Sequence, residues 1–222
     1  MMTRSDSDGY ADILNRGVPL LDVRAPVEFS QGAFPGAINL PLMEDEERHR
    51  VGLRYKQAGQ DSAIKLGHEL VSGQIKNERV AKWVEFAKAH PEGYLYCFRG
   101  GLRSRISQQW LAEAGIQYPR VIGGYKAMRG FLLAQLAQGL AESQFVLIAG
   151  FTGCGKTEVI KSLTATIDLE KLAHHRGSSF GKHANDHPTQ IDFDNSLAIT
   201  FMRLRAQQVK RIALEDESRL IG

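Results

Sequence analysis

The feature that most constrains the fold is the segment 150–157, GFTGCGKT, together with the residues on either side of it. The apolar run 143–150 indicates a buried strand, and residues 155–163 have the spacing of a helix. Between them the glycines, the lysine and the threonine fit the pattern G-x-x-x-x-G-K-[ST]. Main-chain amides of such a loop wrap a diphosphate. The order strand, P-loop, helix predicts a phosphate site in a parallel α/β domain.

The P-loop residues have distinct predicted roles in binding a phosphate-bearing ligand. The glycines let the backbone approach closely, Lys156 neutralises charge, and Thr157 is placed to reach Mg²⁺, the one candidate cofactor of the chain. Cys154 occupies a variable position of the motif and is interpreted as a small filler. The complete predicted set is Gly150, Gly153, Gly155, Lys156 and Thr157.

A second loop, in the stretch 96–105 (YCFRGGLRSR), joins a predicted strand at 93–98 to a predicted helix at 103–116. It places one of only two cysteines among three arginines and two glycines. Amides and the helix dipole at such a junction favour an anion and lower a thiol pKa from about 8.5. Cys97 is therefore predicted to be a catalytic thiolate. The predicted cradle for an anionic donor consists of Arg99, Gly100, Gly101 and Arg103.

The spacing from Cys97 to Arg103 is C-x5-R, which leaves room for a tetrahedral anion such as phosphate. The loop alone therefore also permits phosphate-ester hydrolysis, with the cysteine as nucleophile. Strands expected at 18–23 and 35–41 alternate with helical spacing over 61–89, while the charged stretch 44–58 fits either a loop or a helix. The predicted fold class is α/β, with a parallel-sheet domain over 1–138 and a P-loop domain over 139–222.

Composition indicates the cellular compartment and the kind of partner rather than the reaction. Two cysteines cannot form a disulfide framework, and neither a signal peptide nor a membrane-spanning run is present in the sequence, so a cytoplasmic protein without a membrane partner is expected. The net charge of +3 is compatible with an anionic partner such as RNA. Candidate RNA-backbone contacts, which fit a solvated charged face equally well, are Arg48, Arg50, Arg54 and Lys56.

Two further segments carry weaker signals. Glu215 or Asp216, after a short apolar run, is a candidate for holding Mg²⁺ at a strand end. Residues 172–183, LAHHRGSSFGKH, suit an anion better than a metal because the adjacent His174 and His175 cannot both face one ion from regular structure. No resident metal site is predicted from these residues.

Three segments together resemble a rhodanese domain: DVRAPVEFSQGAFPGAINLP, CFRGGLRS and VIGGYKAMRG. The resemblance implies that Cys97 carries a chalcogen. Asp22 and Arg24 match the DxR element of that family, and Glu28 matches the acidic residue that follows it. These three side chains are interpreted as mainly structural, tying the first strand to loops near the site.

A rhodanese-like domain followed by a P-loop domain, with DLEKLAHHRGSSFG and LEDESRLIG, resembles the tRNA 2-selenouridine synthase family from about residue 10 to residue 222. The resemblance implies a transferase that replaces sulfur by selenium in wobble 2-thiouridine of tRNA. Selenophosphate is the implied donor, and S-geranylation by geranyl diphosphate is the implied preceding step. Cys97 and its loop would then serve selenophosphate, and the P-loop would hold geranyl diphosphate rather than hydrolyse a nucleotide.

Members of that family continue beyond LEDESRLIG, so the expectation is a C-terminally truncated chain with an incomplete P-loop domain and impaired activity. Two other functions stay open from the residues. One is a simple rhodanese-type sulfurtransferase with an accessory phosphate-binding site. The other is a non-catalytic module that binds tRNA or another anion.

Overall fold

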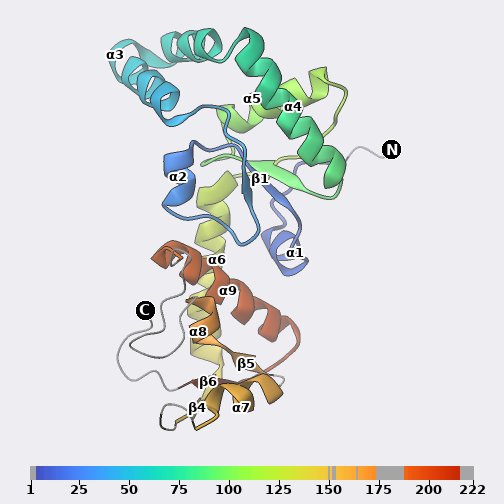
Figure 1. The fold of residues 1–222 in the computed structure, drawn as a ribbon, viewed down its shortest axis with the longest axis vertical. Coiled ribbons are helices and arrows are strands. Elements are labelled where there is room, and N and C mark those ends of the chain that lie inside the picture. The colour runs from blue at the N-terminus through green and yellow to red at the C-terminus, as the bar shows by residue number, and fades with distance from the viewer. Residues whose placement is uncertain (1–3, 150, 152–153, 164, 174–187, 216–222) are drawn as a thin grey trace. The chain divides into compact units, whose positions relative to one another are not determined.

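The computed structural model describes residues 4–149, 151, 154–163, 165–173 and 188–215. These residues form two compact α/β units, 1–129 and 130–222, each built on a parallel sheet (Figure 1). The predicted α/β class with parallel sheets is confirmed. Helix α6 (Gly124–Glu142) begins in the first unit and ends in the second, and the boundary predicted after residue 138 falls inside this helix.

The sheet of the first unit contains β1 (Leu20–Asp22), β2 (Ile38–Asn39) and β3 (Tyr94–Tyr96). The strand order is β2-β1-β3, and both pairings are parallel. Single parallel bridges extend the sheet, one joining Leu95 to Arg120 and another joining Ser7 to Val121. All three strands lie where the apolar runs predicted them, and β1, the central strand of this sheet, is buried at each of its positions.

Five helices complete the first unit together with the start of α6. They are α1 (Tyr10–Asn15), α2 (Pro26–Ser30), α3 (Asp45–Leu70), α4 (Gly73–Ala89) and α5 (Leu102–Glu113). The helical spacing over 61–89 and 103–116 is confirmed, and the charged stretch 44–58 is helical. The core beside the sheet gathers aromatic side chains, among them Trp83 and Trp110, whose rings stack with centroids 6.2 Å apart.

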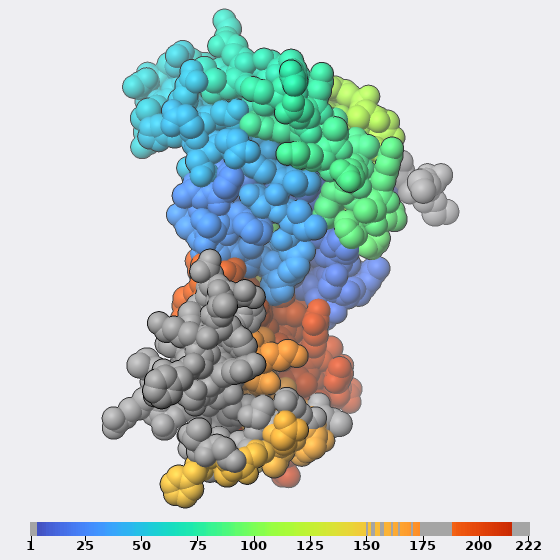
Figure 2. Space-filling view, in the orientation of Figure 1, coloured from blue at the N-terminus to red at the C-terminus, as the bar shows by residue number. Residues whose placement is uncertain are grey.

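Helix α3 is broken in its middle. Gly59 has φ 78° and ψ −176°, a conformation that a residue with a Cβ rarely adopts, and the helical stretches before and after it run in different directions (Figure 1). Most side chains of the first stretch are exposed. The space-filling view shows α3 and α4, in cyan and green, forming one end of the first unit (Figure 2). We call α3 the helical arm.

The second unit contains a three-stranded parallel sheet in the order β4-β6-β5, formed by β4 (Gln144–Ile148), β5 (Thr166–Ile167) and β6 (Arg211–Glu215). The remaining elements are α7 (Lys156–Ser162), α8 (Leu169–Leu172) and α9 (Gln190–Ala206). A small core of Ile167, Phe201, Leu204 and Ile212 holds the sheet against α9.

The prediction that the strand before the P-loop is buried is wrong for the described residues. Val146 is 52% exposed and Leu147 is 62% exposed. The reason is position, because within the described part of the chain β4 is an edge strand that pairs with β6 alone. None of the described helices is long and apolar enough to cross a membrane.

Candidate functional site

The sulfur of Cys97 lies at the floor of the loop between β3 and α5. The residue is only 3% exposed, and its Sγ donates to Ser104 Oγ at 3.3 Å. The Ser104 hydroxyl in turn donates to the carbonyl oxygen of Gly101 at 3.0 Å. A reactant that meets this sulfur therefore has to enter through the loop itself. Ser104 was not foreseen from sequence, because a serine in the first turn of a helix is common at sites without any reaction.

The first turn of helix α6 holds the cysteine loop by hydrogen bonds to two of its carbonyl oxygens. The amide of Tyr125 donates to Cys97 O at 2.9 Å, and the amide of Lys126 donates to Phe98 O at 2.8 Å. In a planar trans peptide the N–H points opposite to the C=O. The amides of Phe98 and Arg99 are therefore directed away from α6, which is the orientation that an anion cradle on the other side of the loop requires.

Gly124 allows the backbone of α6 to lie in close contact with the backbone of the cysteine loop. A Cβ at Gly124, where φ is +61°, would lie 2.3 Å from Cys97 O and 2.4 Å from the Gly100 amide nitrogen. Backbone atoms cannot yield as a flexible side chain can, so no larger residue fits. Contact with the cysteine loop thus explains the second glycine of VIGGYKAMRG, whereas a Cβ at the first, Gly123, would meet Ala127 Cβ at 2.5 Å and Tyr10 Oη at 2.9 Å. Arg120 also helps to fix the cysteine loop, because its Nη1 donates to Gly100 O at 3.3 Å while its Nη2 forms an ion pair with Asp6.

Arg103 is held by Glu28. The guanidinium forms a bidentate pair with the Glu28 carboxylate, with N–O distances of 2.5 and 3.0 Å. Arg48 of the helical arm reaches the same carboxylate through Nε at 3.0 Å, and the amide of Ala25 donates to it at 3.1 Å. Glu28 therefore links α2, the helical arm and the first turn of α5. Arg103 was predicted as part of the anion cradle, and this role stays a prediction; in the structure its guanidinium is already paired with Glu28.

The charges of this network change the pKa of both partners. Burial alone raises the pKa of Glu28, but the hydrogen bonds and charges of Arg103, the Ala25 amide and Arg48 together hold it below its ordinary value of 4.5. Burial lowers the pKa of Arg103, and the hydrogen bond and charge of Glu28, followed by the charge of Cys97, raise it overall. The arginine is thus fixed as a cation near the sulfur.

The other predicted cradle residues are positioned differently. Arg99 is exposed, and Gly100 and Gly101 are partly buried between Cys97 and the start of α5. Gly100 has φ +62°, and a Cβ there would meet the amide nitrogens of Gly123 and Gly124 at 2.7 and 2.9 Å. The structure therefore brings these residues together around the cysteine, with Arg99 on the outer surface.

Asp22 and Arg24 form a buried pair at the end of β1. Arg24 Nε donates to the two carboxylate oxygens at 3.1 and 2.8 Å, and Arg24 Nη2 donates to Gly32 O at 2.9 Å. The guanidinium carbon also lies 3.8 Å from the centroid of the Tyr125 ring. The pair therefore ties β1 to the start of α6, in agreement with the structural interpretation of these two residues.

The predicted phosphate loop is described in part. Gly155 precedes α7 with φ 89°, and the backbones of Lys156 and Thr157 open that helix, as the motif predicts. Cys154 is exposed. Gly150, Gly153, Asp216 and the histidines of 172–183 lie outside the described residues.

The sheet register relates the start of the phosphate loop to one acidic position. Ile148, the last residue of β4, pairs with Glu215, the last residue of β6. The chain thus leaves β4 for the phosphate loop at the carboxyl end of the sheet, where Glu215 ends β6. Among the described residues, no three His, Cys, Asp or Glu side chains form a cluster that could hold a metal ion.

Family models match both units. The model of the rhodanese-like domain matches residues 7–130, and the model described as tRNA 2-selenouridine synthase AAA domain matches residues 143–222. A solved N-terminal domain of an ATP/GTP binding protein from Clostridium difficile 630 is 35% identical, with a TM-score of 0.48; the match covers 52% of this chain and 89% of that one.

Curated relatives cover the whole chain. A tRNA 2-selenouridine synthase of Bordetella petrii is 64% identical over 220 residues, which are 99% of this chain and 59% of the relative. One from Pseudomonas syringae pv. syringae is 60% identical over 221 residues, which are 100% of this chain and 60% of the relative. The chain thus spans about three fifths of the length of these relatives, and the resemblance to their family is confirmed. Because the rhodanese-like model matches residues 7–130 of 222, the chain belongs to the rhodanese-like domain family.

Proposed function

We propose that this chain carries the catalytic thiol and the phosphate loop of a tRNA-modifying transferase, which replaces sulfur by selenium in wobble 2-thiouridine. The observation that carries the proposal is the cysteine loop: a single thiol at its floor, its carbonyls held by α6 and its Phe98 and Arg99 amides directed to the opposite side. The names of the relatives, tRNA 2-selenouridine synthase, supply the substrate class.

Selenophosphate is the proposed ligand of the cysteine loop. Its phosphoryl group has the size and charge that the C-x5-R spacing and the outward-turned amides suit. Arg99, Gly100 and Gly101 would contact it directly, while Arg103, held by Glu28, supplies a fixed positive charge beside the sulfur. Entry through the loop would bring phosphorus against Cys97 Sγ.

The proposed selenation balances without an oxidant. S-geranyl-2-thiouridine, selenophosphate and water give 2-selenouridine, geranyl thiol and phosphate. The Cys97 thiolate would attack phosphorus, so that an S–P bond forms and the P–Se bond breaks. The released selenide attacks C2 of the base, where a C–Se bond forms and the C–S bond to the geranylthio group breaks. Water then cleaves the S–P bond and restores the thiol.

The phosphate loop is the proposed site of the preceding S-geranylation. Amides near Gly155, with Lys156, would bind the diphosphate of geranyl diphosphate and stabilise it as a leaving group. If Mg²⁺ assists, Thr157 and Glu215 are the candidate ligands, because the β4–β6 register puts Glu215 at the carboxyl end of the sheet, from which the phosphate loop departs. The ion would supply charge neutralisation of the diphosphate.

The helical arm is the proposed contact surface for the tRNA backbone. Arg50, Arg54 and Lys56 are exposed there, whereas Arg48 is engaged with Glu28. Exposed cations along one helical stretch can each approach a phosphate, and Arg54 would exchange its long hydrogen bond to Ser62 Oγ, 3.4 Å, for that contact.

The proposal separates two steps, and the test measures them separately. Purified chain is incubated with 2-thiouridine tRNA and geranyl diphosphate, or with S-geranylated tRNA and selenophosphate, and the nucleosides are analysed by mass spectrometry. Lys156→Ala should lose S-geranylation and still selenate S-geranylated tRNA. Cys97→Ser should show the opposite pattern. Loss of both steps in both variants would contradict the assignment of one step to each loop.

A simple sulfurtransferase is the second candidate, favoured by the match to the rhodanese-like model. It predicts thiocyanate from thiosulfate and cyanide without any tRNA. Salt-sensitive tRNA binding without product in either assay would instead favour a non-catalytic binding module.

A further inference from the structure

Arg48, on the helical arm, shares with Arg103 the carboxylate that holds Arg103 beside the cysteine loop. Arg48 Nε lies 3.0 Å from Glu28 Oε2, the oxygen that also accepts from Arg103 Nη1. The Glu28 side chain is 10% exposed, that of Arg103 23% and that of Arg48 44%, so the carboxylate is innermost and Arg48 is outermost. Two positive charges meet one negative charge, and the three side chains together remain cationic.

Contacts at the first turn of the helical arm fix the position of Arg48. The carboxylate of Asp45 accepts a hydrogen bond from the Val27 amide of α2 at 2.9 Å. Two residues later, Glu47 forms an ion pair with Arg79 of α4, with an N–O distance of 2.9 Å. The arm therefore begins in a position defined by both α2 and α4, and the contact of Arg48 with Glu28 follows from that position.

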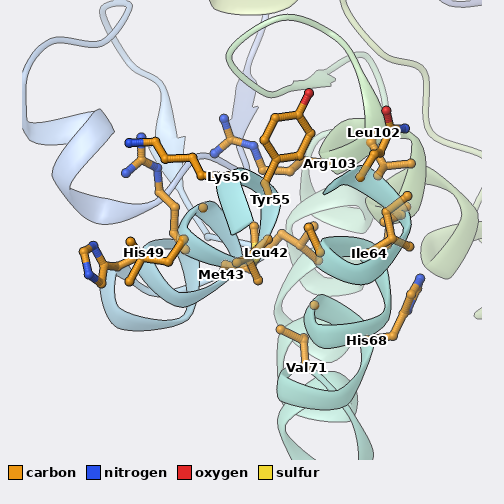
Figure 3. Close-up of a pocket in the computed structure, with 18 of the residues that line it drawn as sticks. Leu42, Met43, His49, Tyr55, Lys56, Ile64, His68, Val71, Leu102 and Arg103 are labelled. Carbon is orange, nitrogen blue, oxygen red and sulfur yellow. The ribbon is translucent and has the colours of Figure 1, made fainter. Parts of the chain in front are cut away.

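Arg48 and Arg103 also line one pocket, of about 720 Å³, between the helical arm and α5. Residues from both stretches of α3 contribute to its lining, and in Figure 3 Lys56 and Arg103 lie with Tyr55 in the upper half of the view. Glu28 is not a lining residue, and no carboxylate is among the residues that line this pocket in the described part of the chain. No acid of the pocket therefore cancels the surplus positive charge of the two arginines.

This surplus charge matters because the pair of Arg103 with Glu28 is neutral by itself. Arg103 lies near enough to Cys97 for the charge of the sulfur to contribute to the raised pKa of the guanidinium. Any charge added to the pair is therefore felt beside the sulfur, where an anion would bind. Arg48 adds that charge, because it neutralises the carboxylate that would otherwise cancel Arg103.

We infer that Arg48 is a positioning residue of the cysteine loop: by sharing Glu28 with Arg103, it supplies the net positive charge that holds an anion beside Cys97. Arg48 acts through Glu28 and does not itself touch the anion. The inference rests on the proposed function, which makes the loop an anion site, and deepens it by assigning part of the donor affinity to the helical arm.

Protection of Cys97 from alkylation measures the anion affinity of this loop alone. In a Cys154→Ser background Cys97 is the single thiol, so phosphate bound elsewhere on the chain does not contribute to the signal. The full chain is treated with iodoacetamide at increasing concentrations of inorganic phosphate and constant ionic strength. Each rate is divided by the phosphate-free rate of the same variant, which gives a dissociation constant that does not depend on the reactivity of the thiol.

Substitutions of the arm separate charge from structure. Arg48→Ala should raise the dissociation constant of phosphate by about three- to tenfold, the effect of one half-exposed charge near the ligand, and this ratio should shrink at about 1 M salt because of screening. Arg48→Lys keeps the charge and should stay within about twofold of the wild type. The matched control, Lys65→Ala, removes an exposed cation of the same helix outside the pocket lining and should change nothing.

Three results would overturn the inference: equal phosphate affinity of Arg48→Ala and Lys65→Ala, no recovery of affinity in Arg48→Lys, and no protection of the wild-type chain by phosphate. If urea unfolding shows that the alanine variant is not folded in the assay, Arg48→Gln takes its place, because it lacks the charge and keeps a long side chain. The assay contains neither tRNA nor selenium. A chain that selenates but shows equal affinities would contradict this inference alone, and the predicted affinities without selenation would contradict the proposed function alone.

Discussion

The replacement of Gly124 by alanine tests how the cysteine loop is held. The new methyl group would lie 2.3 Å from Cys97 O and 2.4 Å from the Gly100 amide nitrogen, both backbone atoms. Relief of this overlap requires the loop and α6 to separate, with loss of the hydrogen bonds that Tyr125 and Lys126 donate to the loop. Alanine at φ +61° also costs about 1–2 kcal/mol. With about 1 kcal/mol for each lost hydrogen bond, the expected total is about 3–4 kcal/mol.

Gly115→Ala is the matched control. Gly115 has φ +82°, and a Cβ there would meet no atom within 4 Å, so this variant carries the backbone cost alone, about 1–2 kcal/mol. Urea unfolding followed by tryptophan fluorescence measures both variants, because Trp83 and Trp110 belong to the first unit. Free energies of unfolding within about 0.5 kcal/mol of each other, a difference at the limit of additivity arguments, would refute the reasoning.

The same pair of variants also changes access to the sulfur. In a Cys154→Ser background only Cys97 can be alkylated, since the chain has two cysteines. A loop weakened by about 2 kcal/mol relative to the control should open about 30-fold more often. Iodoacetamide should therefore modify Gly124→Ala faster than Gly115→Ala by up to that factor.

Three more predictions follow from the site. Glu28→Gln should lower the free energy of unfolding by about 1–3 kcal/mol at neutral pH. Because the folded pKa of Glu28 lies below 4.5, its stabilisation is lost as the pH falls through that folded pKa, so the unfolding free energies of variant and wild type should converge in acid, and a gap that stays constant would argue against the network. Ser104→Ala removes the oxygen that accepts the Cys97 S–H, a hydrogen bond that stabilises the neutral thiol, so alkylation of Cys97 should speed up severalfold at neutral pH, and an unchanged rate would dismiss a role for that contact. Arg54→Ala should reduce the slope of log affinity against log salt for tRNA by about one, measured by filter binding, and an unchanged slope would remove this arginine from the interface.

Much of the fold could be predicted from the sequence because local patterns determine it. The strands of the first unit follow short apolar runs ended by glycine or proline, and α5 follows from its buried face of Trp110 and Leu111. The cysteine between β3 and α5 was located by the same reasoning. The error at β4 has another origin: an apolar strand is buried only if neighbours cover it, and neighbours are a property of the sheet rather than of the run.

The contacts that hold the site were not visible in the sequence. Glu28 and Arg103 are far apart in the chain, and only the packing of α2 beside α5 makes them a bidentate pair. The role of Gly124 depends on two backbone segments that approach each other in space. The pocket between α3 and α5 is likewise lined by residues on both sides of the break at Gly59. A single glycine in a charged helical stretch does not predict such a break.

The most direct test of the central claim is the selenation of S-geranylated tRNA by Cys97→Ser, with Cys154→Ser as the control for loss of a thiol. Nucleoside mass spectrometry follows the appearance of 2-selenouridine from selenophosphate in a single turnover. The account predicts that Cys154→Ser matches the wild-type rate and that Cys97→Ser falls by at least about a hundredfold, the scale expected when a nucleophile is removed. Selenation by Cys97→Ser at the rate of Cys154→Ser would contradict it.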